Sequence, residues 1–218
     1  MRIIVLGGHG AAGRAVVEAL APHNVRAVSR RDGVDAFTGA GLQQSFAGAD
    51  VVIDLFTRFT FSSRRARAIH QTEAENVSSA AQQAGVRHVV VLSIIGVDRN
   101  PHNYYAGKLQ QEQVYEASGV PLTILRAAQF HEFAAQVLDR TSLGPVGLTF
   151  QARIQPVAVQ EVGRRLAAIA TGPPQGRAAD LARPQPESLA EMMRRYAAAD
   201  CSFPPPCRSR SSAACGPD

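Results

Sequence analysis

A phenol and an ammonium group lie four residues apart, at Tyr104 and Lys108, in a segment with a helical pattern. This spacing places both side chains on one face of a helix. A neighbouring ammonium favours the phenolate, and so brings a group that titrates at about pH 10 closer to acid–base work at neutral pH. Of the 23 basic residues, Lys108 is the single lysine. The pair therefore indicates proton transfer, with an ordinary surface lysine beside an aromatic ring as the alternative.

A glycine-rich loop, Gly-Gly-His-Gly-Ala-Ala-Gly, covers residues 7–13 between a predicted strand and a predicted helix. Its glycines satisfy two dinucleotide-binding spacings, one beginning at Gly7 and one at Gly8, which share Gly10 and Gly13. Glycines here allow a tight turn and let backbone N–H groups approach a pyrophosphate, whose charge faces the positive end of the helix. The order strand, loop and helix predicts a dinucleotide site, with a tight turn that binds nothing as the alternative.

Two arginines, Arg30 and Arg31, follow the second predicted strand. Enzymes that use NAD usually carry a carboxylate here, which accepts a hydrogen bond from the ribose 2′-hydroxyl. Two guanidinium groups instead attract a 2′-phosphate, so the sequence favours NADP(H) over NAD(H). Asp32 and Asp35 lie close behind. In the alternative interpretation one of them reaches the ribose and both arginines are solvated.

Ser93 directly follows the fourth predicted strand. Ligands of a doubly wound sheet bind outside the carboxyl ends of its strands. We therefore expect Ser93 and the glycine loop to share one crevice with Leu55, Phe56 and residues 127–130, where Phe130 is expected to contact the cofactor. The Ser93 hydroxyl is placed to donate to a carbonyl oxygen; the alternative is a serine that merely ends the strand or caps a helix.

The elements that position these residues alternate between strand and helix. Five strands are predicted, over residues 2–6, 25–29, 51–55, 88–92 and 122–125. Four helices are predicted between and after them, over residues 11–20, 42–47, 62–84 and 104–117. This rhythm predicts an α/β fold, a Rossmann-like doubly wound parallel sheet.

The rhythm weakens beyond residue 126. Helices are predicted over residues 130–138, 161–170 and 186–199, and short strands over 146–150 and 156–159. We interpret residues 1–199 as one dinucleotide-binding domain, in which residues 127–199 form a small substrate-covering portion. Residues 200–218 are rich in proline and serine, which predicts a disordered tail or an aberrant, frame-shifted end.

Composition narrows the function further. The chain has 218 residues, of which 45% are hydrophobic and 19% charged, as expected for a soluble globular protein. No apolar run reaches the roughly 18 residues of a membrane span, and the glycines at residues 7 and 8 come too early for a secretory signal, so we expect a cytoplasmic protein. All three cysteines lie beyond residue 200, so the first 200 residues offer no thiol nucleophile. The basic residues are spread along the chain, which disfavours a nucleic-acid partner, and no metal site is predicted.

Together these motifs resemble the short-chain dehydrogenase/reductase superfamily, and specifically its atypical NmrA-like, NAD(P)H-binding family. The resemblance covers about residues 1–199 and rests also on segments 49–54, 84–93, 125–133 and 156–162. It implies that the pyrophosphate is surrounded by Gly7, His9, Gly10, Ala11 and Ala12. It further implies that Arg30 and Arg31 meet the adenosine phosphate and that Leu55 and Phe56 flank the adenine ribose. Ser93, Tyr104 and Lys108 occupy the places of the catalytic serine, tyrosine and lysine.

The resemblance implies an NADP(H)-dependent oxidoreductase that moves hydride between nicotinamide and a small carbonyl or quinone-like substrate. Tyr104 would protonate the substrate oxygen, Lys108 would hold the nicotinamide ribose and ease ionisation of the phenol, and Ser93 would polarise the substrate. The alternative is a non-catalytic NAD(P)-binding redox sensor that signals through a partner protein. For the enzyme we expect a monomer or homodimer with a small-molecule substrate and neither a nucleic-acid nor a membrane partner.

Overall fold

The computed structural model describes residues 1–131, 133, 142–143, 146–147 and 153–199. The chain divides into two compact units. The first joins Met1–Phe130 to Gln155–Pro184, and the second joins His131–Ile154 to Gln185–Asp218. The motifs that bear on function lie in the first unit.

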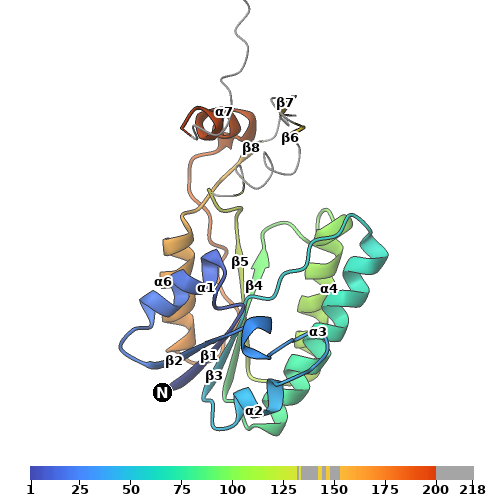
Figure 1. The fold of residues 1–218 in the computed structure, drawn as a ribbon, viewed down its shortest axis with the longest axis vertical. Coiled ribbons are helices and arrows are strands. Elements are labelled where there is room, and N and C mark those ends of the chain that lie inside the picture. The colour runs from blue at the N-terminus through green and yellow to red at the C-terminus, as the bar shows by residue number, and fades with distance from the viewer. Residues whose placement is uncertain (132, 134–141, 144–145, 148–152, 200–218) are drawn as a thin grey trace, which may run out of the picture. The chain divides into compact units, whose positions relative to one another are not determined.

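A six-stranded sheet forms the centre of the first unit (Figure 1). Its strands, all parallel, are β1 (Arg2–Leu6), β2 (Asn24–Val28), β3 (Val51–Asp54), β4 (His88–Ile94), β5 (Leu122–Ala127) and β9 (Gly176–Arg177). In space they follow the order β2-β1-β3-β4-β5-β9. The chain therefore builds outward from β1 in one direction and then in the other, and the switch point between β1 and β3 is where such a sheet opens a ligand crevice.

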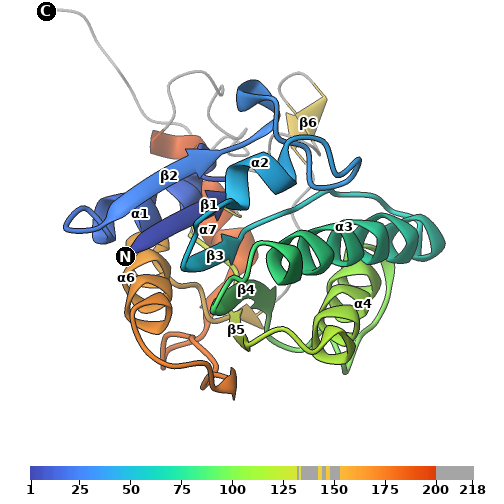
Figure 2. The ribbon, with the colours of Figure 1, turned by 90° about the horizontal axis from the view of Figure 1, so that it is seen from below.

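Helices cover both faces of this sheet (Figure 2). On one face lie α1 (Ala11–Ala19) and α6 (Val159–Ala170), and on the other α2 (Leu42–Phe46), α3 (Ser63–Gln83) and α4 (Asn103–Ser118). Alternate residues of each strand point to opposite faces. In β4, for example, Val89 and Val91 pack with the α3 side and Val90 with the α6 side. Burial on both faces explains the continuous apolar runs in the sequence.

Two glycines let the helices approach each other closely. A Cβ on Gly163 of α6 would lie 2.6 Å from the carbonyl carbon of Ala15 in α1. A Cβ on Gly107 of α4 would lie 2.5 Å from Cδ2 of His70 and 2.8 Å from the carbonyl oxygen of Ala66, both in α3. These contacts leave no room for any side chain, so each helix pair depends on its glycine.

The second unit has a small core of its own. Strand β8 (Arg153–Ile154) pairs antiparallel with β10 (Glu187–Ser188), and helix α7 (Leu189–Ala199) follows. Leu189 and Met193 of α7 are buried against Phe133 and Ile154. A second antiparallel pair joins β6 (Ser142–Leu143) to β7 (Val146–Gly147). No helix in the described ranges is both long enough and apolar enough to cross a membrane.

The predicted α/β sheet is confirmed, with boundaries that differ by no more than two residues for its first five strands. Three details of the later chain were wrong. Residues 156–159 form no strand, because only Val157 makes an isolated bridge, to Phe130, and Val159 already begins α6. Helix α7 begins at Leu189, since the residues before it pair as β10. Strand β9 was not predicted. Most of the predicted helix 130–138, residues 148–150 and the tail 200–218 lie outside the described residues.

Candidate functional site

The glycine loop joins β1 to α1 in a tight turn, and its last glycine, Gly13, packs too closely on the turn to carry a side chain. The N–H of Gly10 donates to the carbonyl oxygen of Gly7 at 3.0 Å, which closes the turn. A Cβ on Gly13 would lie 2.4 Å from that same oxygen, so the first turn of α1 can pack on the loop only without a side chain. No side chain caps the N-terminus of α1, and its first turn, which contains Ala11 and Ala12, holds no acidic residue. Its N–H groups and positive dipole end therefore suit an anion.

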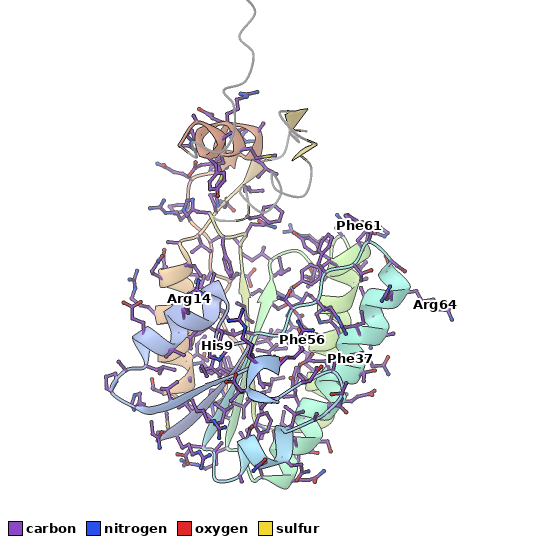
Figure 3. All side chains as sticks on the ribbon, viewed as in Figure 1. His9, Arg14, Phe37, Phe56, Phe61 and Arg64 are labelled. Carbon is purple, nitrogen blue, oxygen red and sulfur yellow. The ribbon has the colours of Figure 1, made fainter. Side chains whose placement is uncertain are left out.

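A hydrogen-bond cluster ties this loop to the end of β2. Oδ2 of Asp32 accepts from the Ser29 N–H at 2.8 Å, from the Ser29 hydroxyl at 3.0 Å and from His9 Nε2 at 2.9 Å. These bonds, from His9 first and then from Ser29, lower the pKa of the Asp32 carboxyl. Arg14 of α1 donates to the His9 carbonyl oxygen at 2.8 Å, and Figure 3 shows both side chains near the start of α1.

Arg30 and Arg31 begin the short 3-10 helix Arg30–Asp32 that follows β2. Both side chains are exposed, and neither makes an ion pair with any residue in the described part of the chain. The nearby Asp35 differs, because its Oδ1 accepts from the Phe37 N–H at 2.9 Å. Two guanidinium groups thus remain available at the end of β2, whereas the two carboxylates that follow them, Asp32 and Asp35, already accept hydrogen bonds.

Leu55 and Phe56 follow β3 and adjoin the glycine loop. The Leu55 N–H donates to the carbonyl oxygen of Leu6 at 3.1 Å. A Cβ on Gly7 would lie 3.2 Å from the Leu55 carbonyl oxygen, so the two loops touch at the switch point. Phe56 is held by its N–H, which donates to Asp54 Oδ1 at 2.8 Å, and by its ring, whose centroid lies 5.4 Å from that of His70.

Tyr104 reaches the same edge of the sheet from the first turn of α4. Its Oη lies 2.6 Å from Oγ1 of Thr57, three residues beyond the end of β3. The Tyr104 ring contacts the rings of Phe59 and His70, at centroid distances of 5.8 and 5.6 Å. Burial raises the pKa of Tyr104 to about 12, although the hydrogen bond with Thr57 opposes the shift. The phenol is therefore protonated at neutral pH.

Lys108, one turn further along α4, does not follow Tyr104 to that edge. Its side chain is 2% exposed, and Nζ donates to Oε1 of Gln111. Gln111 in turn donates through Nε2 to Oδ2 of Asp54 at 2.9 Å and to Oε2 of Glu73 at 2.8 Å. Burial lowers the pKa of Lys108, while Asp54 and Glu73 oppose the shift. The ammonium thus belongs to a buried network that links α4 to β3 and α3.

Ser93 is likewise 2% exposed and lies beside Glu112 of α4. Arg126 of β5 grips Glu112 with two bonds, Nε to Oε1 at 3.0 Å and Nη2 to Oε2 at 2.7 Å. Arg177 of β9 adds a third, at 3.0 Å. Although burial opposes it, the hydrogen bonds from Arg126 lower the pKa of Glu112. The buried Ser93 hydroxyl itself has no hydrogen-bond partner among the described residues. Ser93 therefore faces a structural ion-pair cluster inside the α4 side of the sheet.

Phe130 lies beyond β5, where it bridges to Val157 and packs on the apolar cluster of the α6 side. The neighbouring Gln129 donates to the Tyr105 hydroxyl at 2.8 Å, which ties this segment to the start of α4.

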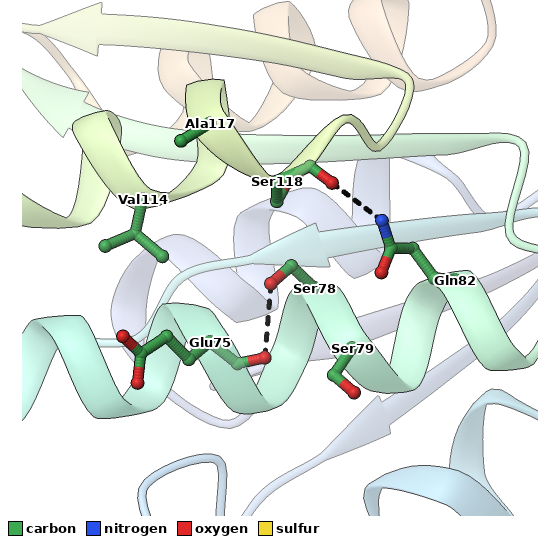
Figure 4. Close-up of a pocket in the computed structure, with 7 residues that line it drawn as sticks. All are labelled: Glu75, Ser78, Ser79, Gln82, Val114, Ala117 and Ser118. Carbon is green, nitrogen blue, oxygen red and sulfur yellow. Dashed lines mark hydrogen bonds between the residues drawn. The ribbon is translucent and has the colours of Figure 1, made fainter.

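Two surface hollows lie elsewhere. One of about 350 Å³ lies on the outer surface of α3 and α4, between Glu75 and Ser118 (Figure 4), and one of about 450 Å³ lies between α1 and α6 near His23 and Arg164. Neither hollow is lined by a residue of the glycine loop, by Tyr104 or by Thr57, so both lie outside the site.

The sheet order, the glycine loop and the crevice at β1 and β3 agree with what comparison with known proteins finds. Residues 7–173, more than two thirds of the chain, match a family described as NAD(P)H-binding. The chain belongs to the NAD(P)H-binding family. This confirms the resemblance to NmrA-like NAD(P)H-binding proteins that the sequence motifs indicated.

Among characterised relatives of this NAD(P)H-binding protein is the (4-alkanoyl-5-oxo-2,5-dihydrofuran-3-yl)methyl phosphate reductase of Streptomyces griseus subsp. griseus. The two are 32% identical over 144 residues, 59% of this chain and 48% of the relative, so the chain spans about half of that relative's length. Two solved structures share the fold. MoeE5 in complex with UDP-glucose and NAD is 20% identical with a TM-score of 0.75, covering 91% of this chain and 82% of its own. The triphenylmethane reductase of Citrobacter sp. with NADP(H) is 18% identical with a TM-score of 0.69, covering 91% and 76%.

Sequence reasoning missed two features of this NAD(P)H-binding protein. One is the hydroxyl of Thr57, which no motif marks. The other is the buried network, for which a signal existed: Lys108, Gln111 and Tyr115 recur at helical spacing along one face of α4. Polar side chains on a helix face that packs against the sheet need buried hydrogen-bond partners. Asp54 and Glu73 are these partners.

Proposed function

We propose that this protein is an NADP(H)-dependent oxidoreductase that transfers hydride between nicotinamide and a small carbonyl or quinone-like substrate. The observation that carries this proposal is the hydrogen bond between Tyr104 and Thr57. Because Thr57 lies three residues beyond the end of β3, this bond would hold a protonated phenol near the switch point between β1 and β3, where the glycine loop also lies. A proton donor next to a dinucleotide crevice is what carbonyl reduction requires.

The residues of the crevice fit a dinucleotide. Because Gly7 and Gly13 carry no side chains, the backbone of the loop can approach a pyrophosphate closely. The first turn of α1 has no side-chain cap, so its N–H groups can donate to that pyrophosphate. His9, Gly10, Ala11 and Ala12 would surround that group. Leu55 and Phe56 would flank the adenine ribose, and Phe130 would contact the cofactor from the end of β5.

NADP(H) is preferred in this proposal because of the charges at the end of β2. Arg30 and Arg31 are exposed and suit a 2′-phosphate. In contrast, Oδ2 of Asp32 already accepts three hydrogen bonds, and Asp35 accepts one from Phe37. A ribose 2′-hydroxyl would have to compete with these donors, whereas a phosphate would not.

The protein's part in the reaction is proton transfer and orientation. Bound nicotinamide supplies or accepts the hydride. In the direction of reduction, Tyr104 donates its proton to the substrate oxygen, and its raised pKa keeps that proton available at neutral pH. Lys108 contributes a positive charge from the neighbouring turn of α4. For Lys108 or Ser93 to touch a bound ligand, the side chain has to move, since each is 2% exposed.

Aromatic rings beside Tyr104 support a planar, apolar substrate. Phe59 is 46% and Phe61 78% exposed, and their rings meet at a centroid distance of 4.9 Å. Phe59 continues this surface to the Tyr104 ring, and Figure 3 shows Phe61 on the loop before α3. Rings of this kind stack on flat conjugated molecules. A quinone or an aromatic ketone would therefore present its oxygen near the phenol.

The test is a panel of carbonyl and quinone substrates with NADPH and NADH, assayed by nicotinamide oxidation. Wild-type protein should oxidise NADPH with at least one of them. Tyr104→Phe should lower the turnover by at least about a hundredfold, because it removes the acid, and leave the NADPH dissociation constant within about twofold. Unchanged turnover in Tyr104→Phe would remove the phenol from the mechanism.

A second candidate function, a non-catalytic NAD(P)-binding redox sensor, is favoured by the burial of Ser93 and Lys108. Such a protein needs the crevice but no open catalytic side chains. It would bind both cofactor forms, consume no NADPH with any substrate of the panel, and bind a protein partner with an affinity that depends on the cofactor's redox state.

A further inference from the structure

We propose that Thr57 is a positioning residue for Tyr104, which aims the phenol into the crevice and stabilises its oxygen once the proton has left. This inference rests on the proposed reductase function. Within the described residues, Thr57 makes the one hydrogen bond to the Tyr104 oxygen, at 2.6 Å. That distance is at the short end of the range for bonds between hydroxyl groups.

Thr57 is held firmly enough to act in this way. The preceding residue, Phe56, donates its N–H to Asp54 at 2.8 Å, and its ring contacts His70. Both anchors are buried, because Asp54 and His70 expose none of their surface. The Thr57 side chain itself is exposed, so the bond to Tyr104 lies where a ligand can reach it.

Within the described part of the chain, the residues expected to assist Tyr104 make no hydrogen bond with its oxygen. Lys108 donates to Gln111 inside the network, and the Ser93 hydroxyl is buried without a hydrogen-bond partner among the described residues. His70 contacts the Tyr104 ring, but burial lowers its pKa to about 3, so it carries no charge at neutral pH. Thr57 is therefore the group with both the position and a proton to donate to the Tyr104 oxygen.

Bound NADPH would supply the hydride: its nicotinamide C–H bond would break as a C–H bond forms at the substrate carbonyl carbon, so that NADPH is oxidised to NADP⁺ and the carbonyl is reduced. The carbonyl oxygen would take the proton of Tyr104 as the phenol O–H bond breaks. The phenolate oxygen then accepts a hydrogen bond from the Thr57 hydroxyl, which keeps its own proton. Water returns a proton to Tyr104 before the next turnover.

The charges around Tyr104 make such a donor valuable. Burial first, and then the charge of Asp54 in β3, disfavour a phenolate, and the Thr57 bond is the opposing influence on the Tyr104 pKa. Tyr105 is the neighbouring phenol, and Lys108 is the nearby cation of α4, with His70 neutral. Loss of the Thr57 hydroxyl should therefore make the phenolate harder to form.

The experiment compares Thr57→Val with Thr57→Ser, and uses Thr60→Val as a matched control in the same loop. Thr57→Val should lower kcat for NADPH-dependent quinone reduction by about 10- to 100-fold, the usual effect of losing a hydrogen bond to a charged group. KM and the NADPH dissociation constant should stay within about twofold, and the alkaline limb of the kcat–pH profile should move to higher pH. Thr57→Ser should restore kcat to within about threefold, and Thr60→Val should resemble the wild type.

A second measurement needs no turnover. In protein with isotope-labelled tyrosine, the Tyr104 Cζ chemical shift, assigned with Tyr104→Phe, should change in Thr57→Val but not in Thr57→Ser. If wild-type protein reduces a substrate and Thr57→Val keeps its kcat and pH profile, the inference is overturned and the proposed function stands. If no substrate is reduced, the proposed function fails, and a Cζ shift unchanged in Thr57→Val overturns the pairing as well.

Discussion

Asp54 at the end of β3 and Glu73 in the middle of α3 are joined in the interior of the protein by one side chain, the amide of Gln111. Both side chains are fully buried, and both accept hydrogen bonds from the Gln111 amide, at 2.9 and 2.8 Å. Burial, followed by the charge of Asp54 and a hydrogen bond with it, raises the pKa of Glu73 well above its ordinary value of 4.5. The protonated form of Glu73 is therefore favoured in the folded protein.

The raised pKa of Glu73 predicts how this residue makes stability depend on pH. Above pH 4.5 an unfolded chain releases the Glu73 proton, whereas the folded protein keeps it until its raised pKa is reached. The contribution of Glu73 to the free energy of unfolding should therefore fall as pH rises from 4.5 towards that raised pKa, with a slope of up to about 1.4 kcal/mol per pH unit. Glu73→Gln, which mimics the protonated acid, should remove that part of the slope in urea denaturation curves. Glu75→Gln, an exposed site on the same helix, should keep it.

The close contact of α3 and α4 gives a second prediction. Gly107→Ala should destabilise the protein by about 1–3 kcal/mol, because the new methyl group overlaps backbone of Ala66 and the ring of His70. Alanine has the better helix propensity, so any loss measured here understates the overlap. Gly172→Ala is the control, since its Cβ would meet only ordinary contacts, and its stability should change by less than about 1 kcal/mol. Equal thermal denaturation midpoints for the two variants would contradict this packing.

Cofactor preference gives a third prediction. The double variant Arg30→Ala/Arg31→Ala should weaken NADPH binding by about 10- to 100-fold, as expected for loss of charge-assisted bonds to a phosphate, and leave NADH binding within about twofold. Added salt should weaken NADPH binding in the wild type more than in the variant. Calorimetric titration measures both, with Arg64→Ala, an exposed arginine on α3 visible in Figure 3, as the control. Parallel losses for NADPH and NADH would argue that the arginines do not read the 2′-phosphate.

The first five strands of the sheet could be predicted from the sequence, because each is a short apolar run that glycine or polar residues bound on either side. The run from His88 to Leu92, for instance, is buried on both faces and so carries its own signal. Strand β9 has only two residues, Gly176–Arg177, and a pattern of alternation cannot show in so short a segment. It pairs because Thr123 and Ile124 of β5 offer it an edge, which is information held elsewhere in the chain.

The site was predictable in its backbone and less so in its side chains. The glycine loop is local, since Gly7 and Gly13 meet within one turn of chain. The direction of Lys108 depends on Asp54 and Glu73, which lie 54 and 35 positions earlier in the chain. Residue spacing within α4 shows which side chains share a face, but not which partners that face will meet. Thr57 could not be predicted from the motif around Tyr104 for the same reason, because it lies 47 positions earlier in the chain.

Helix α6, which packs on α1 at Gly163, is synthesised after the strands that it covers. Strands β1 to β5 leave the ribosome well before α6, yet α6 contacts β3, β4 and β5 and joins Val90 of β4 in one buried apolar cluster. A nascent chain therefore exposes apolar residues on the α6 side of the sheet to solvent until residue 170 has been synthesised and has emerged from the ribosome. During that interval the protein depends on fast synthesis or on chaperones to avoid aggregation. A ribosome that stalls before α6 would leave a partly folded, aggregation-prone chain in which one face of the sheet is not fully covered.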